Sequence, residues 1–284
     1  MKVALLDTFK EGIQILERKG FPDARISCEE LLAHVTHQPR VKIYTEPKDE
    51  IPGKIRDKFI QLVKKRAKHE PLQYLIGQVP FRNAQIRIQK GTLIPRPETE
   101  ILVETVLKKI AEKKSVSTKI LDVGTGSGCV AISLAQECSL AQIHATDISV
   151  RSLKLAAHNA EANQVRSRIV FRKVSYWPKD FEKFDWVVSN PPYLSTKDFD
   201  HLQPELEFEP KQALFAGRDG LRCYRFMICH AGEILKSRGG MAFEVGMGQA
   251  QTVATMFKNH GFHSIEITKD LSGIERIVLA ELRN

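Results

Sequence analysis

Asn190-Pro191-Pro192-Tyr193 directly follows a short apolar stretch, residues 184–189, which we expect to be a strand. Neither proline has an N–H, so a sheet ladder cannot continue through them, and each biases its predecessor toward an extended backbone. The side-chain oxygen of Asn190 and the carbonyl of Pro191 then form two neighbouring acceptors beside the ring of Tyr193. A planar –NH2 group needs two acceptors and a flat surface, so the motif predicts an amine site. The alternative is an ordinary loop, which Pro-Pro often marks.

A glycine-rich turn, Gly124-Thr125-Gly126-Ser127-Gly128, lies between an expected strand at 119–123 and an expected helix at 128–137. The glycines allow a ligand to approach the backbone, and the free N–H groups of a helix start can bind a carboxylate or phosphate. The spacing is G-x-G-x-G, whereas the dinucleotide fingerprint is G-x-G-x-x-G and would place its third glycine where this chain has Cys129. The departure argues against NAD.

Asp147 follows the next expected strand, 142–146, at a distance suited to a ribose contact. A carboxylate there can accept hydrogen bonds from both ribose hydroxyls. The alternative is that Asp147 caps the following helix, as Asp often does. Because ligands of open α/β sheets lie beyond the carboxyl ends of the strands, we expect the glycine turn, Asp147 and Asn190 to meet in one crevice.

Together these motifs resemble a class I S-adenosylmethionine-dependent methyltransferase that methylates amino groups. Other segments resemble the HemK/PrmC-type family, the release-factor glutamine methyltransferases. They are residues 71–77, 93–100, 208–210, 213–214 and 220–221. N-P-P-Y is shared with adenine N6 methyltransferases of DNA and RNA, and the segment L-I-P-R-P-E-T-E at 93–100 separates the two families.

The resemblance implies a reaction and its residues. S-adenosyl-L-methionine would be the methyl donor, with S-adenosyl-L-homocysteine as product. The acceptor would be the side-chain amide nitrogen (N5) of the glutamine in the Gly-Gly-Gln motif of class I peptide-chain release factors. Residues 190–193 would bind the substrate, with Asn190, Pro191 and Tyr193 serving catalysis. The cofactor residues would be 124–128, Asp147, Trp177 and Asn190.

Several assignments stay open. Trp177 could stack on adenine or belong to the core; the resemblance favours adenine, although the preceding Tyr176 departs from the small or acidic residue expected there. Arg96 and Glu98 lie in a segment that we expect to line the cofactor pocket, without individual roles, and Pro97 also suits a helix start. Glu244 ends an expected strand and is interpreted as structural.

The chemistry requires mainly that the nitrogen be aimed. An amide nitrogen is a poor nucleophile, whereas a sulfonium methyl is strongly electrophilic. Two acceptors that hold the N–H donors orient the nitrogen and favour the positive charge that grows on it. No general base is needed beforehand, because the methylated cation loses its proton readily.

The element pattern predicts an α/β fold with an N-terminal helical bundle, and the resemblance implies a Rossmann-like seven-stranded class I methyltransferase sheet. We expect a helical domain at 1–75, which the resemblance implies is a substrate-docking domain, a β-hairpin linker at 76–92 and a catalytic domain at 93–284. Strand and helix alternate in the last domain, which indicates a mostly parallel sheet with helices on both faces. Only six residues, 269–274, join the last two expected strands (263–268 and 275–281), so these should pair antiparallel. The other expected strands are 169–174 and 240–245, and the other helices are 98–112, 149–162, 221–236 and 248–259.

Composition narrows the class of protein without deciding it. The 284 residues carry a net charge of +9, and residues 1–90 hold 18 Lys or Arg against 11 Asp or Glu. This basic excess could steer an acidic partner or RNA, or could simply be solvated. Five cysteines without C-x-x-C pairing indicate free thiols in a reducing compartment. We therefore expect a cytoplasmic monomer with no metal, no membrane contact and no stable nucleic-acid binding.

Three functions from different classes follow. The first is a glutamine methyltransferase acting on release factors. The second is a nucleic-acid adenine methyltransferase, favoured by N-P-P-Y and the basic N-terminal part but lacking a recognisable nucleic-acid domain. The third is a non-catalytic RNA- or ribosome-associated module, against which the intact glycine turn, Asp147 and Asn190 argue.

Overall fold

The computed structural model describes residues 2–113 and 117–283. The chain divides into two compact units. The helical unit contains Met1–Gln78 and Gln203–Phe208, and the sheet unit contains Val79–Leu202 and Glu209–Asn284. Residues Gln203–Phe208 therefore belong to the helical unit, although in sequence they lie between two segments of the sheet unit. The expected linker hairpin, formed by β3 (Gln78–Phe81) and β4 (Ala84–Arg87), belongs almost wholly to the sheet unit.

The sheet unit is built on seven strands in the order β10-β11-β9-β8-β5-β6-β7. Strands β5 to β9 pair parallel with one another, whereas β11 is antiparallel to both β9 and β10. This confirms the predicted fold class and the antiparallel ending. The strands are β5 (Thr118–Val123), β6 (Ala141–Asp147), β7 (Ile169–Lys173), β8 (Phe184–Ser189), β9 (Leu235–Glu244), β10 (Phe262–Lys269) and β11 (Glu275–Leu282).

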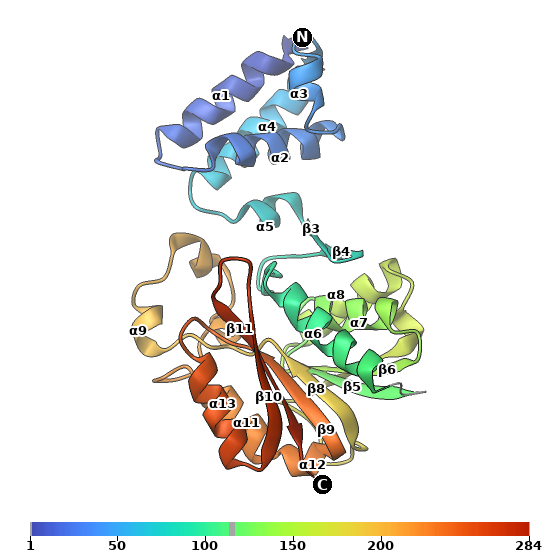
Figure 1. Cartoon of the computed structure of the whole chain (residues 1–284). Helices are drawn as coiled ribbons and strands as arrows, with labels where there is room; N and C mark the ends of the chain where they lie inside the picture. Colours follow the sequence, from blue (N-terminus) through green and yellow to red (C-terminus); the bar gives the residue numbers. More distant parts are fainter. Residues whose placement is uncertain (1, 114–116, 284) are drawn as a thin grey trace. The chain divides into compact units, whose positions relative to one another are not determined.

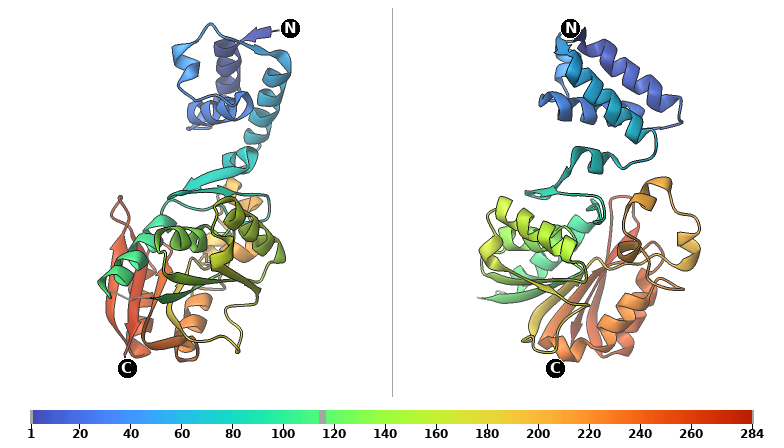
Figure 2. Two further views of the ribbon diagram at one scale, coloured as in Figure 1. Left: turned by 90° about the vertical axis from the view of Figure 1, so that its right-hand side faces the viewer. Right: turned by 180° about the vertical axis from the view of Figure 1, so that it is seen from behind.

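Helices cover both faces of this sheet, as Figures 1 and 2 show. One face carries α6 (Thr99–Glu112), α7 (Cys129–Glu137) and α8 (Val150–Ala162), and the other carries α11 (Arg222–Cys229), α12 (Ala231–Ile234) and α13 (Ala250–Asn259). The single helix expected at 221–236 is wrong: it breaks at His230, and β9 begins at Leu235 because that residue already pairs with Phe184 of β8.

Three short helical segments between β8 and α11 were not predicted. They are α9 (Thr196–Phe199), η2 (Pro204–Phe208) and α10 (Lys211–Leu214). Each is at most five residues long, which is too short for an apolar period to show in the sequence.

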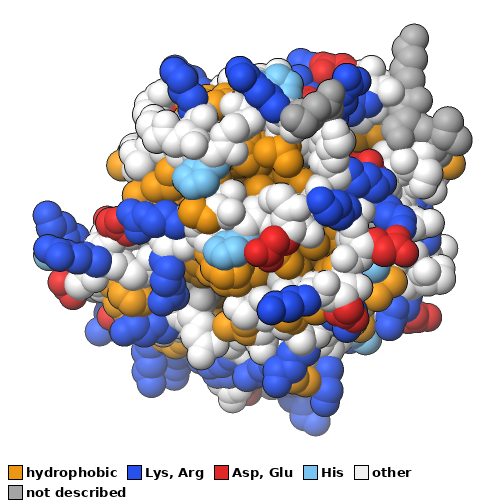
Figure 3. Space-filling view, turned by 90° about the horizontal axis from the view of Figure 1, so that it is seen from below, with side chains coloured by type: hydrophobic (Ala, Val, Ile, Leu, Met, Phe, Trp, Pro, Cys, Tyr) orange, Lys and Arg blue, Asp and Glu red, His pale blue; other side chains and the backbone are white. Residues whose placement is uncertain are grey.

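The face drawn in Figure 3 mixes all side-chain types. Lys and Arg side chains are spread over it, interspersed with acidic and apolar ones. On this face the charge is that of an ordinary solvated surface.

The helices of the helical unit pack their apolar side chains into a hydrophobic core. Leu16, Leu31 and Phe59, from three different helices, are fully buried there. A two-stranded antiparallel ribbon that the sequence did not indicate, β1 (Lys2–Ala4) with β2 (Glu50–Pro52), joins the start of the unit to its middle. The helices are α1 (Leu5–Glu17), α2 (Ala24–Thr36), α3 (Lys42–Thr45), α4 (Gly53–Arg66) and α5 (Leu72–Ile76).

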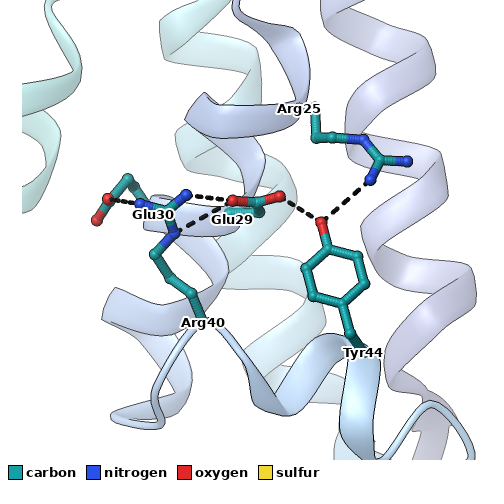
Figure 4. A network of polar contacts seen from close by, with 5 residues as sticks. All are labelled: Arg25, Glu29, Glu30, Arg40 and Tyr44. Carbon is teal, nitrogen blue, oxygen red and sulfur yellow. Dashed lines mark hydrogen bonds and ion pairs between the residues drawn. The ribbon is translucent and has the colours of Figure 1, made fainter.

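A polar network ties α2 to the segment around α3 (Figure 4). The Glu29 carboxylate, which is largely buried, accepts hydrogen bonds from Arg40 and from the hydroxyl of Tyr44. Arg25 donates to the same hydroxyl at 3.3 Å, and Arg40 also bonds Glu30 at 2.7 Å. A buried carboxylate is stable only when its lone pairs are satisfied, so this network orders the α2–α3 connection.

Asp23, which precedes α2, binds a buried arginine. Its side chain makes no capping bond to α2 but accepts from Ser27 at 2.8 Å and from Arg66 at 3.1 Å. Arg66 is only 4% exposed and also donates to Glu205 at 2.6 Å. The ion pair between Arg66 and Glu205 attaches residues 203–208 to the helices of this unit.

Gly240→Ala should destabilise the protein. A Cβ there would lie 2.3 Å from the ring of Trp186 on the neighbouring strand, and both residues are buried in the sheet. Overpacking of this kind costs about 1–3 kcal/mol, and urea denaturation should show that loss. The control is Gly232→Ala, where a Cβ meets nothing within 4 Å; an equal loss there would contradict the packing argument.

Candidate active site

The parallel strands end together at one edge of the sheet. Val123 pairs with Thr146 between β5 and β6, and Ser189 pairs with Phe243 between β8 and β9. The residues after these pairs therefore lie at one edge. They are Gly124, Asp147, Asn190 and Glu244.

A cavity of about 520 Å³ opens at this edge. Its volume lies within the range of small-molecule sites. The glycine turn and the N-P-P motif both line this cavity and therefore surround the same space. The lining includes residues 124–127, Asp147, 174–176, 190–192 and 210–213, and Leu93, Pro95 and Thr99 of the segment 93–100.

The glycine turn has a backbone that glycine alone adopts without strain. Gly124, Gly126 and Gly128 have φ values of 75°, 57° and 88°. The N–H groups of Gly124 and Thr125 both donate to the carbonyl of Thr146, at 2.8 and 2.9 Å. The turn is thereby fixed to the end of β6, next to Asp147.

Asp147 does not cap the helix that follows it. Ser149 is the N-cap of α8 and accepts from the N–H of Ser152 at 3.2 Å. Asp147 Oδ1 accepts from the N–H of Ser149 at 2.8 Å, and its Oδ2 accepts from the N–H of Gly126 at 3.0 Å. Burial raises the pKa of this carboxyl, and the backbone hydrogen bonds oppose that rise. Asp147 is therefore oriented by the backbone while it lines the cavity.

Two buried polar residues support the turn and were missed by the sequence analysis. Asp122, at 2% exposure, accepts from the hydroxyl of Thr125 at 2.7 Å, and burial raises its pKa to about 7. Asn159 in α8 is fully buried and donates both to the carbonyl of Ser127 at 2.8 Å and to that of Arg87 at 2.9 Å. The signal for Asp122 was a carboxylate inside an otherwise apolar strand; Asn159 gave none.

Asn190 is held by its amide nitrogen. Nδ2 donates to Thr99 Oγ1 at 3.1 Å, and Thr99 donates to Glu244 Oε2 at 2.5 Å. The Asn190 oxygen lies on the opposite branch of the planar amide, so it points away from Thr99. Pro191 and Pro192 also line the cavity, and Pro191 is buried.

Tyr193 is not among the residues that line the cavity; it packs beside the main core. Its carbonyl accepts from the side chain of Gln249 at 2.9 Å, and burial raises the pKa of its hydroxyl to about 12. A Cβ at Gly220 would lie 2.2 Å from the Tyr193 carbonyl, so only glycine fits there. Tyr193 thus anchors the end of the N-P-P-Y turn, and contact with a substrate amide stays a prediction.

An ion pair joins two of the segments that resemble the HemK/PrmC-type family, residues 93–100 and 208–210. The Glu209 side chain is only 2% exposed; it binds the guanidinium of Arg96 and accepts from the N–H of Ile94 at 3.0 Å. Glu98 lies 4.0 Å from Arg276. Arg96 therefore has an identifiable role, because it fastens the segment 93–100 beside Pro210 at the cavity.

Trp177 does not line the cavity, although it was expected to contact the cofactor. It is buried in the core cluster, and the preceding Tyr176 lies at the cavity instead. Tyr176 has a positive φ of 63°, and its ring stacks on Phe226 with centroids 4.0 Å apart. Of the two adjacent aromatic residues in this turn, Tyr176 lines the cavity, and contact of Trp177 with the cofactor stays a prediction.

Within residues 2–113 and 117–283, no group of three or more His, Cys, Asp or Glu could hold a metal ion. In the same ranges, none of the helices has the length and apolar character needed to cross a membrane.

Known proteins resemble this chain over most of its length. The Methyltransferase small domain family matches residues 97–217, and the PrmC N-terminal domain family matches residues 7–77. A release factor glutamine methyltransferase from Thermodesulfovibrio yellowstonii is 37% identical over 89% of this chain and 91% of its own. One from Geobacter sulfurreducens is 38% identical over 93% and 91%.

A solved structure shares the fold. The 16S rRNA N2 G1207 methyltransferase of Thermus thermophilus, in complex with AdoMet and guanosine, has a TM-score of 0.53 at 15% identity. The match covers 72% of this chain and 50% of that one. At this identity the likeness concerns the fold alone.

Asp122→Asn should stabilise the protein more at pH 8 than at pH 5. The folded-state pKa of about 7 lies above the ordinary value of 3.8, so the folded state binds more protons and stability falls as pH rises toward 7. Asparagine removes that loss, a gain of about 2 kcal/mol between the two pH values. Urea denaturation at both pH values measures it. The control Asp180→Asn alters a side chain that is 67% exposed; a gain independent of pH at Asp122 would contradict the assignment.

Proposed function

Because this chain belongs to the family of release factor glutamine methyltransferases, we propose that it methylates the glutamine of the Gly-Gly-Gln motif in class I peptide-chain release factors. The methyl group of S-adenosylmethionine would go to the side-chain amide nitrogen. The observation that supports this best is that the glycine turn, Asp147 and Asn190 line one cavity. A methyl donor and an amine acceptor must share such a space for a direct transfer.

The residues present fit the cofactor. A Cβ built on Gly126 would meet only the carbonyl of Gly124 at 3.9 Å, so the turn is open to a ligand. Asp147 offers a fixed carboxylate to ribose hydroxyls, and Tyr176 is an aromatic residue that lines the same cavity and would contact adenine. When bound, S-adenosylmethionine supplies an electrophilic methyl group.

Asn190 and Pro191 would orient the acceptor. The Asn190 side-chain oxygen and the Pro191 carbonyl accept from the two N–H groups of the glutamine amide and direct its nitrogen. Orientation of this kind lowers a barrier by several kcal/mol, up to about 7–11 in ideal intramolecular cases. The same two oxygens favour the positive charge that develops on nitrogen, and the methylated product then releases a proton.

The relatives favour a protein substrate over a nucleic acid. Residues 7–77, most of the helical unit, match the PrmC N-terminal domain, and we assign to this unit the docking of the release factor. An adenine methyltransferase would share the N-P-P-Y motif but would have no need for the segment 93–100, which is fastened at the cavity through Glu209.

Asn190→Ala should reduce methyl transfer to release factor by at least a hundredfold while S-adenosylmethionine still binds. The substitution removes one of the two acceptors but leaves the glycine turn and Asp147 in place. Transfer of labelled methyl to purified release factor and calorimetry with the cofactor measure the two properties. A release factor whose Gly-Gly-Gln glutamine is replaced by alanine should take no label. Label on nucleic acid alone, or near-normal turnover of the variant, would contradict the proposal.

Tyr176→Ala should weaken S-adenosylmethionine binding, whereas Trp177→Phe should not. Stacking of a base on an aromatic ring is worth about 1–3 kcal/mol, so the Kd should rise about tenfold or more. Tyr176 lines the cavity and Trp177 does not. Calorimetric Kd values test this; a larger effect at Trp177 would restore the original expectation.

A further inference from the structure

A hydrogen-bonded relay runs from Asn190 of the N-P-P-Y motif through Thr99 to Glu244 in the protein interior. On the basis of the proposed function, we infer that Thr99 and Glu244 are positioning residues that hold the Asn190 amide with its oxygen toward the glutamine substrate. Asn190 itself would touch the substrate, whereas Thr99 and Glu244 act through it.

The relay has a defined place in the fold. Asn190 follows β8 and Glu244 ends β9; these strands are parallel neighbours, and Ser189 pairs with Phe243 one residue earlier. Thr99 lies in the segment 93–100 and is the first residue of α6. Three elements far apart in the chain thus meet at one hydroxyl.

The distances and the burial define a closed system. Asn190 Nδ2 to Thr99 Oγ1 is 3.1 Å and Thr99 Oγ1 to Glu244 Oε2 is 2.5 Å. Thr99 is 2% exposed and Glu244 is 3% exposed, so both groups lie in a largely desolvated environment. The hydroxyl of Tyr224 donates to the Glu244 carbonyl at 2.9 Å and fixes the residue further.

The direction of the hydrogen bonds decides which end of the amide faces the cavity. An ionised carboxylate can only accept hydrogen bonds, so the Thr99 hydroxyl must donate its hydrogen bond to Glu244. The Thr99 oxygen is then left as an acceptor and selects the NH2 end of Asn190. The Asn190 oxygen must therefore face away, toward the space that the substrate amide would occupy.

Protonation of Glu244 removes this selection. A protonated carboxyl can donate to Thr99, whose hydroxyl is then free to donate to the Asn190 oxygen and turn the NH2 end toward the cavity. An NH2 group there repels the N–H groups of a glutamine amide. The pKa of Glu244 is raised to about 7, chiefly by burial and also by Glu98, while Thr99, Arg276 and Arg96 limit the rise. Tyr193 also faces it, with a pKa of about 12.

The first experiment replaces the hydroxyl that relays the selection. Thr99→Val keeps the shape but breaks both hydrogen bonds, and we expect kcat for release-factor methylation to fall about tenfold, with KM for release factor and Kd for S-adenosylmethionine within twofold of the wild type. Thr99→Ser, which keeps the hydroxyl, should restore kcat. Thr105→Val removes a threonine hydroxyl that donates to the Ile101 carbonyl in the same helix, and should leave kcat unchanged.

The second experiment uses pH. In the wild type, kcat should fall as pH drops through about 7, because Glu244 takes up a proton. Glutamine can donate or accept, so Glu244→Gln should have a kcat about tenfold lower at pH 8 and lack the decline below pH 7. If the decline persists in Glu244→Gln, or if Thr99→Val keeps the wild-type kcat, the relay does not position Asn190.

These outcomes are separable from a failure of the proposed function. If the wild-type protein transfers no label to release factor, the proposed function fails and the relay assignment fails with it. If the wild type labels release factor and the variants behave like it, only the relay is wrong. Should Thr99→Val not fold, Thr99→Ser and the pH profile of Glu244→Gln still decide the matter.

Discussion

The parallel pairing of β5, β6, β8 and β9 is the constraint on which the site depends. Parallel strands that are in register end at one edge, so three separate motifs, the glycine turn, Asp147 and N-P-P, reach the same cavity although they lie far apart in the sequence. Each motif alone is only a turn, a capping residue or a proline break. The sheet makes them one site. Hydrogen bonds to the Thr146 carbonyl fix the glycine turn, and the hydrogen bond from Gln249 fixes the N-P-P-Y turn.

The cavity is surrounded by buried polar groups that a purely structural fold would avoid. Asp122 and Glu244 lie almost without exposure at the ends of central strands, and burial raises the pKa of each to about 7. Buried carboxyls are costly unless they are hydrogen-bonded. Here each has a threonine hydroxyl as partner, Thr125 and Thr99. Both threonines line the cavity, so these costly buried carboxyls lie where rigid groups are needed to orient a ligand.

The diagnostic segment 93–100 owes its position to long-range contacts. Glu209 binds Arg96 and the Ile94 N–H, and Thr99 reaches Glu244. These partners lie more than a hundred residues away in sequence. The segment was recognised from its sequence, but its function as a bridge between β9 and the residues between η2 and α10 follows only from the folded chain.

Much of the fold could be predicted because local chemistry dictates it. The period of apolar residues gave the helices and strands of the sheet unit to within a few residues, except where the expected helix 221–236 divides at His230 and β9 begins early. Short segments such as α9 and the β1–β2 ribbon carry no period and were missed. The motifs placed Gly126, Asp147 and Asn190 correctly at the cavity.

The sequence by itself determined which chemical groups are present and in what local geometry: a glycine turn, a strand-end carboxylate and an Asn-Pro-Pro acceptor pair. Only the tertiary structure decided which neighbours hold them. It selected Tyr176 over Trp177 at the cavity, gave Asn159 to the glycine turn and linked Asn190 to Glu244 through Thr99. The physical reason is that backbone preferences act over a few residues, whereas burial and hydrogen-bond partnership depend on strands and helices brought together from distant parts of the chain.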